Sequence, residues 1–256
     1  MPQQQFCCKK AMNATLMGLD CGRQDLVFIG NREPAAAWTR DLALEICFVF
    51  ATNAAFALPL SMLWRRRRAS DTATGVATML TSALYHYCDT TRRTVFGMTA
   101  GNWHRLDNVF AIVSMNALVP LLLGPASDDK KRQLEDAFRW SSLVIALFFQ
   151  ELNPWHLGCM LAPVLGGFAF YALWACYAAP RGHAQKFLTR GFAAGCAALA
   201  VSLFFFALGL DEARDVFRMW HGLWHVFNAA AAALFIAALL PFDGSPQKGD
   251  ALLHVE

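Results

Sequence analysis

Long apolar segments separated by short polar stretches make up most of the chain after residue 40. Most of these segments approach the roughly 20 residues that a helix needs to cross a membrane. The pattern predicts seven helices, at about 42–64, 72–88, 106–124, 137–152, 157–179, 187–210 and 220–240. The segment at 137–152 is short and contains Arg139, so it fits the pattern least well. We therefore expect an all-α bundle of seven transmembrane helices.

The composition supports a membrane protein. Hydrophobic residues make up 56% of the chain and charged residues 16%, which is unlike a soluble domain. The net charge is only +3, and Lys and Arg lie in short clusters between apolar segments, so a nucleic-acid partner is not expected. The expected organisation is a short extracellular or lumenal tail (1–40), a transmembrane domain (41–241) and a short cytoplasmic tail (242–256).

The loop charges predict an orientation. Four consecutive arginines, Arg65 to Arg68, follow the first apolar segment, and such a block is typical of the cytoplasmic side. The loops on that side also hold more Lys and Arg than the opposite loops. We therefore expect the N-terminus outside and the C-terminus inside, in a multi-pass protein of the plasma membrane or an endomembrane.

Two histidines begin the last apolar segment. His221 and His225 are four residues apart, so their side chains lie about one turn apart on one helix face and can bind one metal ion. The alternative is that the pair anchors the helix end at the membrane interface, as Trp220 and Trp224 can. The choice depends on whether other ligands lie at the same depth.

The predicted orientation brings further polar residues to that depth. His86 lies near the outer end of the second helix, and Asp107 lies in the first turn of the third. Ionisable residues at membrane depth usually face the bundle interior and mark a functional site. The clustering therefore favours a metal site near the extracellular or lumenal leaflet.

The remaining polar residues have structural alternatives. Ser82 lies one turn before His86, but a helical serine can also bond to its own backbone. Asp107 in a first turn would complement the helix dipole whatever its function, and this is the preferred explanation for Asp41 and Glu45. Two other histidines are expected in loops and are left out of the site, His104 and His156.

Several motifs together resemble a known pattern. The first is Ser82 followed by His86, which lies in the run from Tyr85 to Asp89. The others are Asp107, the tripeptide Asn153-Pro154-Trp155, and the run from His221 to His225 in the segment that ends at Pro241. They resemble the pattern shared by alkaline ceramidases, the adiponectin and progestin receptors, and the transmembrane protein 8 family, which includes myomaker. The resemblance to the last family is the best and covers the chain after about Ala36.

The resemblance implies a seven-helix bundle that holds zinc through His86, His221 and His225, with Ser82 and Asp107 as catalytic residues. Three imidazoles leave a fourth tetrahedral position open, as in catalytic zinc sites. Asp107 would orient or deprotonate water, and Ser82 would donate a hydrogen bond to a developing oxyanion. The expected partners are the lipid bilayer and a lipid substrate within it.

Two branches of the resemblance lead to different functions. Myomaker-like members lack the serine of the second helix and act in membrane fusion, so Ser82 favours the hydrolase branch. The expected function is zinc-dependent hydrolysis of a lipid ester or amide, in a phospholipid, a GPI anchor or a ceramide-like lipid. The alternatives are a non-enzymatic fusion or remodelling protein, or a receptor, with a structural zinc.

Overall fold

The computed structural model describes residues 40–123, 129–177, 187–211 and 214–240. Within these ranges the regular secondary structure is helical, with one isolated β-bridge. The predicted tails lie outside the described residues, except for Arg40. The elements in chain order are α3 (Arg40–Val49), η2 (Ala51–Phe56), α4 (Ala57–Arg65), α5 (Ala69–Thr91), α6 (Ala100–Asn116), α7 (Leu118–Leu123), α8 (Asp129–Leu152), α9 (Leu157–Tyr177), α10 (Arg190–Gly209), η4 (Val216–Arg218) and α11 (Met219–Leu239).

The helices confirm an all-α membrane protein. In the described ranges, five helices are long and apolar enough to cross a membrane, and they span Arg40–Arg65, Ala100–Leu123, Leu157–Tyr177, Arg190–Gly209 and Val216–Leu239. Helices α5 and α8 are as long, with 23 and 24 residues, but they carry more polar side chains. Their crossing of the membrane stays a prediction, as do the total of seven spans and the orientation.

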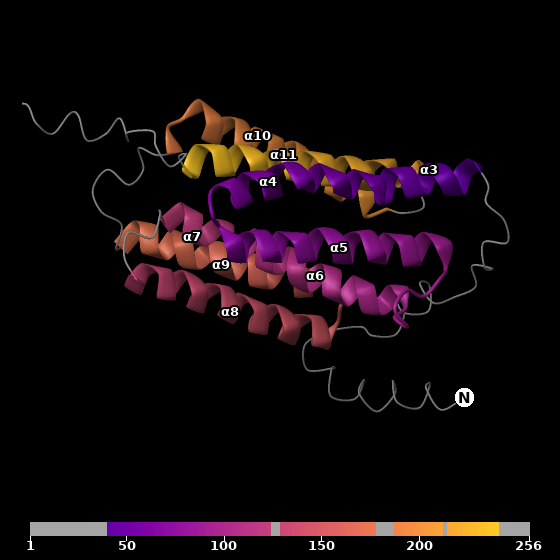
Figure 1. Cartoon of the computed structure of the whole chain (residues 1–256), viewed down its shortest axis with the longest axis horizontal. Helices are drawn as coiled ribbons and strands as arrows, with labels where there is room; N and C mark the ends of the chain where they lie inside the picture. The colour runs from indigo at the N-terminus through magenta and orange to yellow at the C-terminus, as the bar shows by residue number, and fades with distance from the viewer. Residues whose placement is uncertain (1–39, 124–128, 178–186, 212–213, 241–256) are drawn as a thin grey trace, which may run out of the picture. The chain divides into compact units, whose positions relative to one another are not determined.

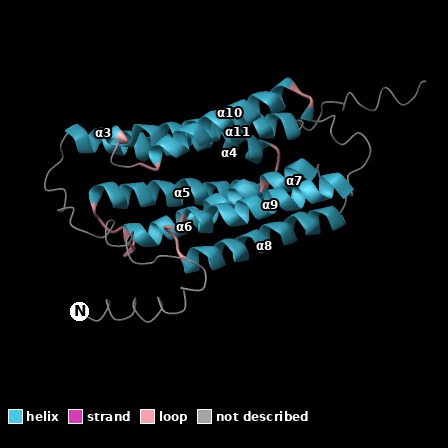
Figure 2. Cartoon of the chain, turned by 180° about the vertical axis from the view of Figure 1, so that it is seen from behind, coloured by secondary structure: helices cyan, strands magenta, loops and turns pink. Residues whose placement is uncertain are grey.

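The helices of residues 40–240 form two layers. Helices α3, α4, α10 and α11 lie in one layer and α5 to α9 in the other, as both views show (Figures 1 and 2). In the first layer α10 packs along α11, and α11 contacts α3, η2 and α4. In the second, α6 packs against α5, α8 and α9. Helix α5 also contacts α3, η2 and α4, so the layers meet along α5.

Prolines explain the interruptions of the apolar helices. Proline cannot donate the backbone hydrogen bond to the carbonyl four residues earlier. The apolar segment Arg40–Arg65 passes through the 3-10 segment η2 just before Pro59, and the segment Ala100–Leu123 is divided between α6 and α7 just before Pro120. Pro163 lies inside α9 and frees the carbonyl of Cys159, which accepts a hydrogen bond from the buried Gln150 amide at 3.4 Å.

A buried charge network explains why α8 tolerates Arg139. Its guanidinium lies 2.6 Å from the Asp71 carboxylate of α5. Asp71 also pairs with Arg68 at 2.6 Å, and Arg68 pairs with Glu135 of α8 at 2.9 Å. Asp71 and Glu135 are buried, so these charges are removed from solvent as paired groups. We call these four residues the charge network.

The structure corrects two predicted positions. Helix α6 begins at Ala100, six residues before the predicted start. Asp107 therefore lies in the third turn and not the first, so the helix-dipole explanation does not apply to it. His104 lies inside α6 and not in a loop, whereas His156 does lie in the loop before α9. The early start follows from Trp103, which is buried against Tyr85 and Cys88 and extends the helix beyond the apolar run.

Candidate metal centre

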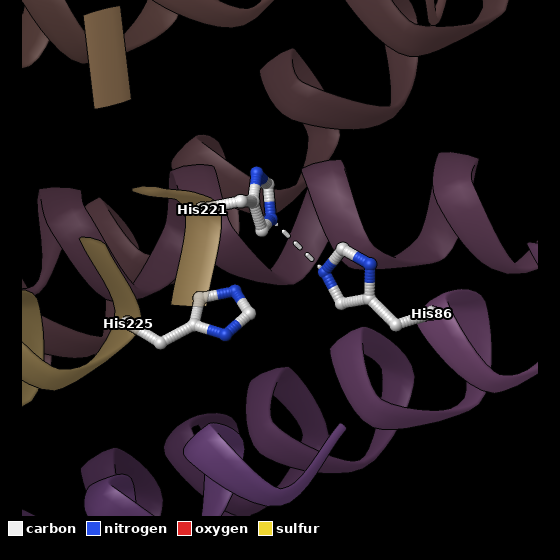
Figure 3. Close-up of side chains that lie close together, drawn as sticks. All are labelled: His86, His221 and His225. Carbon is white, nitrogen blue, oxygen red and sulfur yellow. Dashed lines mark hydrogen bonds between the residues drawn. The ribbon is translucent and has the colours of Figure 1, made fainter. Parts of the chain in front are cut away.

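Three histidines from two helices converge between the layers. His86 comes from α5, and His221 and His225 come from α11 (Figure 3). One nitrogen of each ring lies within 4.8 Å of the others, and the Nε2 atoms of His86 and His221 are 3.1 Å apart. The side chains of His86 and His225 are each only 1% exposed. The structure thus brings together the three predicted ligands.

The turn before α11 fixes His221. The Asp215 carboxylate accepts hydrogen bonds from the backbone N–H groups of Trp220 at 2.8 Å and of His221 at 3.1 Å. It thereby satisfies two of the N–H groups that the start of a helix leaves without a backbone partner. Phe217 and Arg218, both with φ of 55°, make the tight turn that brings Asp215 back over the helix end. The position of His221 is therefore set by local backbone structure.

Gly222 lets α11 approach α3. A Cβ atom at this position would lie 2.3 Å from the backbone oxygen of Phe48, closer than any real contact. Only a glycine between His221 and His225 allows this approach. The close packing brings η2, which follows α3, to the side of His225.

Thr52 of η2 orients His225. Its hydroxyl donates to the backbone oxygen of Phe48, so its own oxygen is left to accept a hydrogen bond from Nδ1 of His225 at 3.2 Å. This arrangement places the proton on Nδ1 and leaves the lone pair on Nε2. Metal-binding histidines usually have such a partner on the second nitrogen. Thr52 was not among the predicted site residues, although the polar pair Thr52 and Asn53 in the middle of a mostly apolar segment is a visible signal.

The histidine cluster fits a metal ion. Nε2 of His225 is buried and has no hydrogen-bond partner among the described residues. Zinc–nitrogen bonds of about 2.0–2.1 Å place tetrahedral ligands roughly 3.3 Å apart. The pair of His86 and His221 is close to this spacing, and the widest pair would have to draw in by up to roughly 1.5 Å. A cation at the centre would satisfy Nε2 of all three rings.

Ser82 and Asp107 share a cavity with His225. Helices α5 and α6 pack together, and the Ser82 hydroxyl interacts with the Asp107 carboxyl. Both residues and His225 line a cavity of about 220 Å³ between the layers. Most other lining residues are apolar. Three of the five predicted site residues therefore line this cavity, and the other two, His86 and His221, lie beside His225.

Charged residues tie the helices together beside the histidines. The Arg218 guanidinium lies 3.3 Å from Asp89 at the end of α5 and 4.0 Å from Glu45 of α3. Arg218 and Asp89 are buried. Glu45, which we had assigned to the helix dipole, thus also has an ion-pair partner. His104 stacks on Trp155 with ring centroids 3.8 Å apart and is not one of the three clustered histidines.

The fold and the site define an all-helical membrane protein with a buried histidine cluster between two helices. The family described as Protein of unknown function (DUF3522) matches residues 41–226, which is most of the chain. The chain belongs to this family. The matched region contains Ser82, His86, Asp107, His221 and His225. No curated protein matches the chain.

Proposed function

We propose that the protein is a membrane-embedded, zinc-dependent hydrolase that releases an acyl chain from a lipid ester or amide. The observation that carries this proposal is the convergence of His86, His221 and His225, the last of which lines a mostly apolar cavity together with Ser82 and Asp107. Zinc matches three neutral imidazoles with an open fourth position better than Mg²⁺ or Ca²⁺, which prefer oxygen ligands.

The cavity has the character expected for an acyl chain. Along α11 it extends from His225 to Ile236, which is roughly 16 Å at the helical rise of 1.5 Å per residue. Away from the histidines the cavity is lined mostly by apolar residues such as Leu63, Leu121 and Phe235, and Asp71 of the charge network also lines it. A lipid chain could occupy this apolar part while its ester or amide lies beside Asp107 and Ser82.

Each polar residue has its own role in the proposed hydrolysis. Zinc, when bound, supplies Lewis acidity toward a carbonyl and toward water. The Asp107 carboxylate is placed to accept a proton from water as it attacks the acyl carbon, and to return it to the leaving oxygen or nitrogen. The Ser82 hydroxyl is placed to donate a hydrogen bond to the carbonyl oxygen as negative charge develops there. Thr52 holds the ring of His225.

The proposal includes seven spans, with α5 and α8 among them, and the N-terminus outside the cytosol. The Arg139–Asp71 pair supports a crossing of α8, because it neutralises the arginine that disfavours this segment. In this orientation the metal centre faces the extracellular or lumenal leaflet of the plasma membrane or an endomembrane. An antibody should reach a C-terminal tag only after the membrane is permeabilised. Antibody labelling of that tag on intact cells would show that the orientation is the opposite of the one proposed.

The five site residues Ser82, His86, Asp107, His221 and His225 support the inclusion of this chain among the transmembrane protein 8 and myomaker proteins, within the wider group of alkaline ceramidases and adiponectin and progestin receptors.

The second candidate function, membrane remodelling or fusion, is supported by one observation. The three histidines join α5 of one layer to α11 of the other, so a bound zinc could serve only to hold the layers together. A receptor with a structural zinc would use the same arrangement.

Purified protein would be tested for zinc content and for fatty-acid release from a panel of ceramides, phospholipids and GPI lipids. The hydrolase proposal predicts about one zinc per chain, release from at least one lipid, and loss of release in Ser82→Ala with zinc retained. Zinc without release from any lipid would favour the structural role. Release that is unchanged in Ser82→Ala would remove Ser82 from the mechanism.

A further inference from the structure

The connection between α5 and α6 forms a tight hairpin, residues 92–99. Val95 N–H donates to the Met98 carbonyl at 3.1 Å, and Met98 N–H donates to the Val95 carbonyl at 3.0 Å. The two residues between them, Phe96 and Gly97, have φ of 51° and 73°. Two consecutive positive φ values are the mark of a two-residue hairpin turn of type I′.

Phe96 is an unusual residue at this position. Type I′ turns strongly prefer Asn, Asp or Gly, because a bulky side chain is unfavourable at positive φ. The Phe96 side chain is also 85% exposed, so burial within the fold does not compensate. Its positive φ disfavours a phenylalanine here, and the contact with the Trp103 ring leaves most of the side chain exposed.

Hydrogen bonds and apolar contacts hold the hairpin that carries Phe96 against the rest of the chain. Trp103 donates its Nε1 hydrogen to the Val95 carbonyl at 3.3 Å, and its ring lies edge-on to Phe96 with centroids 6.5 Å apart. Val95 and Met98 pack against the cluster of Tyr85, Cys88 and Trp103. The exposed ring therefore projects from a hydrogen-bonded and packed turn.

Two arginines, Arg92 and Arg93, precede the exposed ring in the same connection. Arg93 is exposed, and Arg92 at the end of α5 lies 3.8 Å from Asp89. An apolar ring and cations in one short connection match the boundary between acyl chains and phosphates, where aromatic rings and long basic side chains gather at the ends of transmembrane helices. The phosphate charge is complementary to the arginines.

We propose that the 92–99 hairpin is a phospholipid-binding surface, in which Phe96 enters the acyl boundary of the leaflet and Arg93 binds a lipid phosphate. The hairpin joins α5, which carries Ser82 and His86, to α6, which carries Asp107. Its attachment to the leaflet sets the depth of both helices at the end that holds the histidine cluster. This inference does not depend on zinc or on hydrolysis.

Photocrosslinking in native membranes tests the contact. Benzoylphenylalanine would replace Phe96 in the full chain, with the same replacement of Phe204 and Ile112 as references. Phe204 is 60% exposed on the spanning helix α10, and Ile112 is 0% exposed in the core and does not line the cavity. We expect a phospholipid adduct from positions 96 and 204 and none from 112. An adduct of position 96 with another polypeptide, or none while position 204 reacts with lipid, would overturn the proposal.

A second measurement separates lipid binding from folding. Asn tolerates positive φ, so Phe96→Asn should leave the hairpin and the thermal stability in detergent intact. Binding of phosphatidylglycerol, measured by native mass spectrometry, should weaken in Phe96→Asn and fall by about 5-fold in Arg93→Gln, while Arg93→Lys keeps it. Unchanged lipid binding in both Phe96→Asn and Arg93→Gln would contradict the inference. A large loss of thermal stability of Phe96→Asn in detergent would also contradict it, because Phe96 would then be needed for the fold.

Discussion

Two clusters of buried polar residues lie near opposite ends of α5. The charge network surrounds Asp71 near the start of the helix, and the histidine cluster surrounds His86, 15 residues later or roughly 22 Å along the axis. In the charge network each carboxylate has a guanidinium partner within 3 Å. In the histidine cluster three similar rings face one another, and Nε2 of His225 has no partner among the described residues.

The two clusters differ in whether their groups are paired within the chain. The charge network also leaves atoms unbonded in the described structure, Nη2 of Arg68, Nε of Arg139 and Oε1 of Glu135, but each belongs to a group that is already paired. Paired charges of this kind join α5 to α8 and need no further ligand. In the histidine cluster, Nε2 of His86 and Nε2 of His221 have only each other, and Nε2 of His225 has no partner among the described residues. This arrangement favours a ligand from outside the chain.

The largest expected effect is loss of the metal. His86→Ala, His221→Ala and His225→Ala should each reduce zinc from about one per chain to nearly none, because two imidazoles hold the ion far less tightly than three. Mass spectrometry of purified protein measures the zinc. The controls His104→Ala and His156→Ala should retain it. Full zinc in His225→Ala would show that this residue is not a ligand and that the contrast between the clusters is smaller than proposed.

Asp107→Asn tests catalysis without removing a ligand. The amide keeps the shape of the side chain but cannot accept the proton, and loss of a general base typically lowers a rate by about 100-fold to 10,000-fold. We expect a protein that purifies normally, binds zinc and releases fatty acid at this reduced rate from whichever lipid the wild type hydrolyses. Full activity in Asp107→Asn would refute the mechanism and leave the zinc site untouched.

Arg139→Met tests the other cluster. It leaves Asp71 with one partner fewer, and breaking a buried ion pair costs about 3–5 kcal/mol of unfolding free energy. The matched control is Asp136→Ala, because Asp136 also pairs with Arg139 but is 59% exposed, and such a pair contributes about 0–1 kcal/mol. Denaturant titration in detergent measures both. Zinc content should not change in folded Arg139→Met protein, and its loss would show that the two clusters are coupled.

The smallest expected effect concerns the orientation of His225. Thr52→Val keeps the side-chain shape but removes the hydroxyl that accepts from Nδ1, and loss of such a partner typically weakens metal binding by about 10-fold to 100-fold. Thr52→Ser should retain near-normal affinity. Competition with a zinc chelator measures the difference. Equal affinity in Thr52→Val and wild type would mean that the packing of α11 alone orients the ring.

Local patterns made much of the fold predictable. Apolar segment length predicted the helices, and the start at Leu157 and the end near Leu239 agree closely with α9 and α11. The early start of α6 was not predicted, because polar residues such as His104 and Arg105 interrupt the apolar pattern there. Packing of Trp103 stabilises this first part of the helix. The histidine cluster could be predicted because His221 and His225 share one helix face. His86 could be added because the predicted helix directions place it at the same membrane depth as that pair.

The sequence by itself determined the all-helical membrane class and which residues share a helix face, because apolar length and the spacing of four residues act within a single helix. Contacts between helices depend on how each helix rotates and where it bends. Gly222, the break before Pro59 and the turn at Phe217 set these angles, and only the tertiary structure shows that they bring Thr52 to His225. The pairing of Arg139 with Asp71, 68 residues away in the chain, was likewise decided by packing alone.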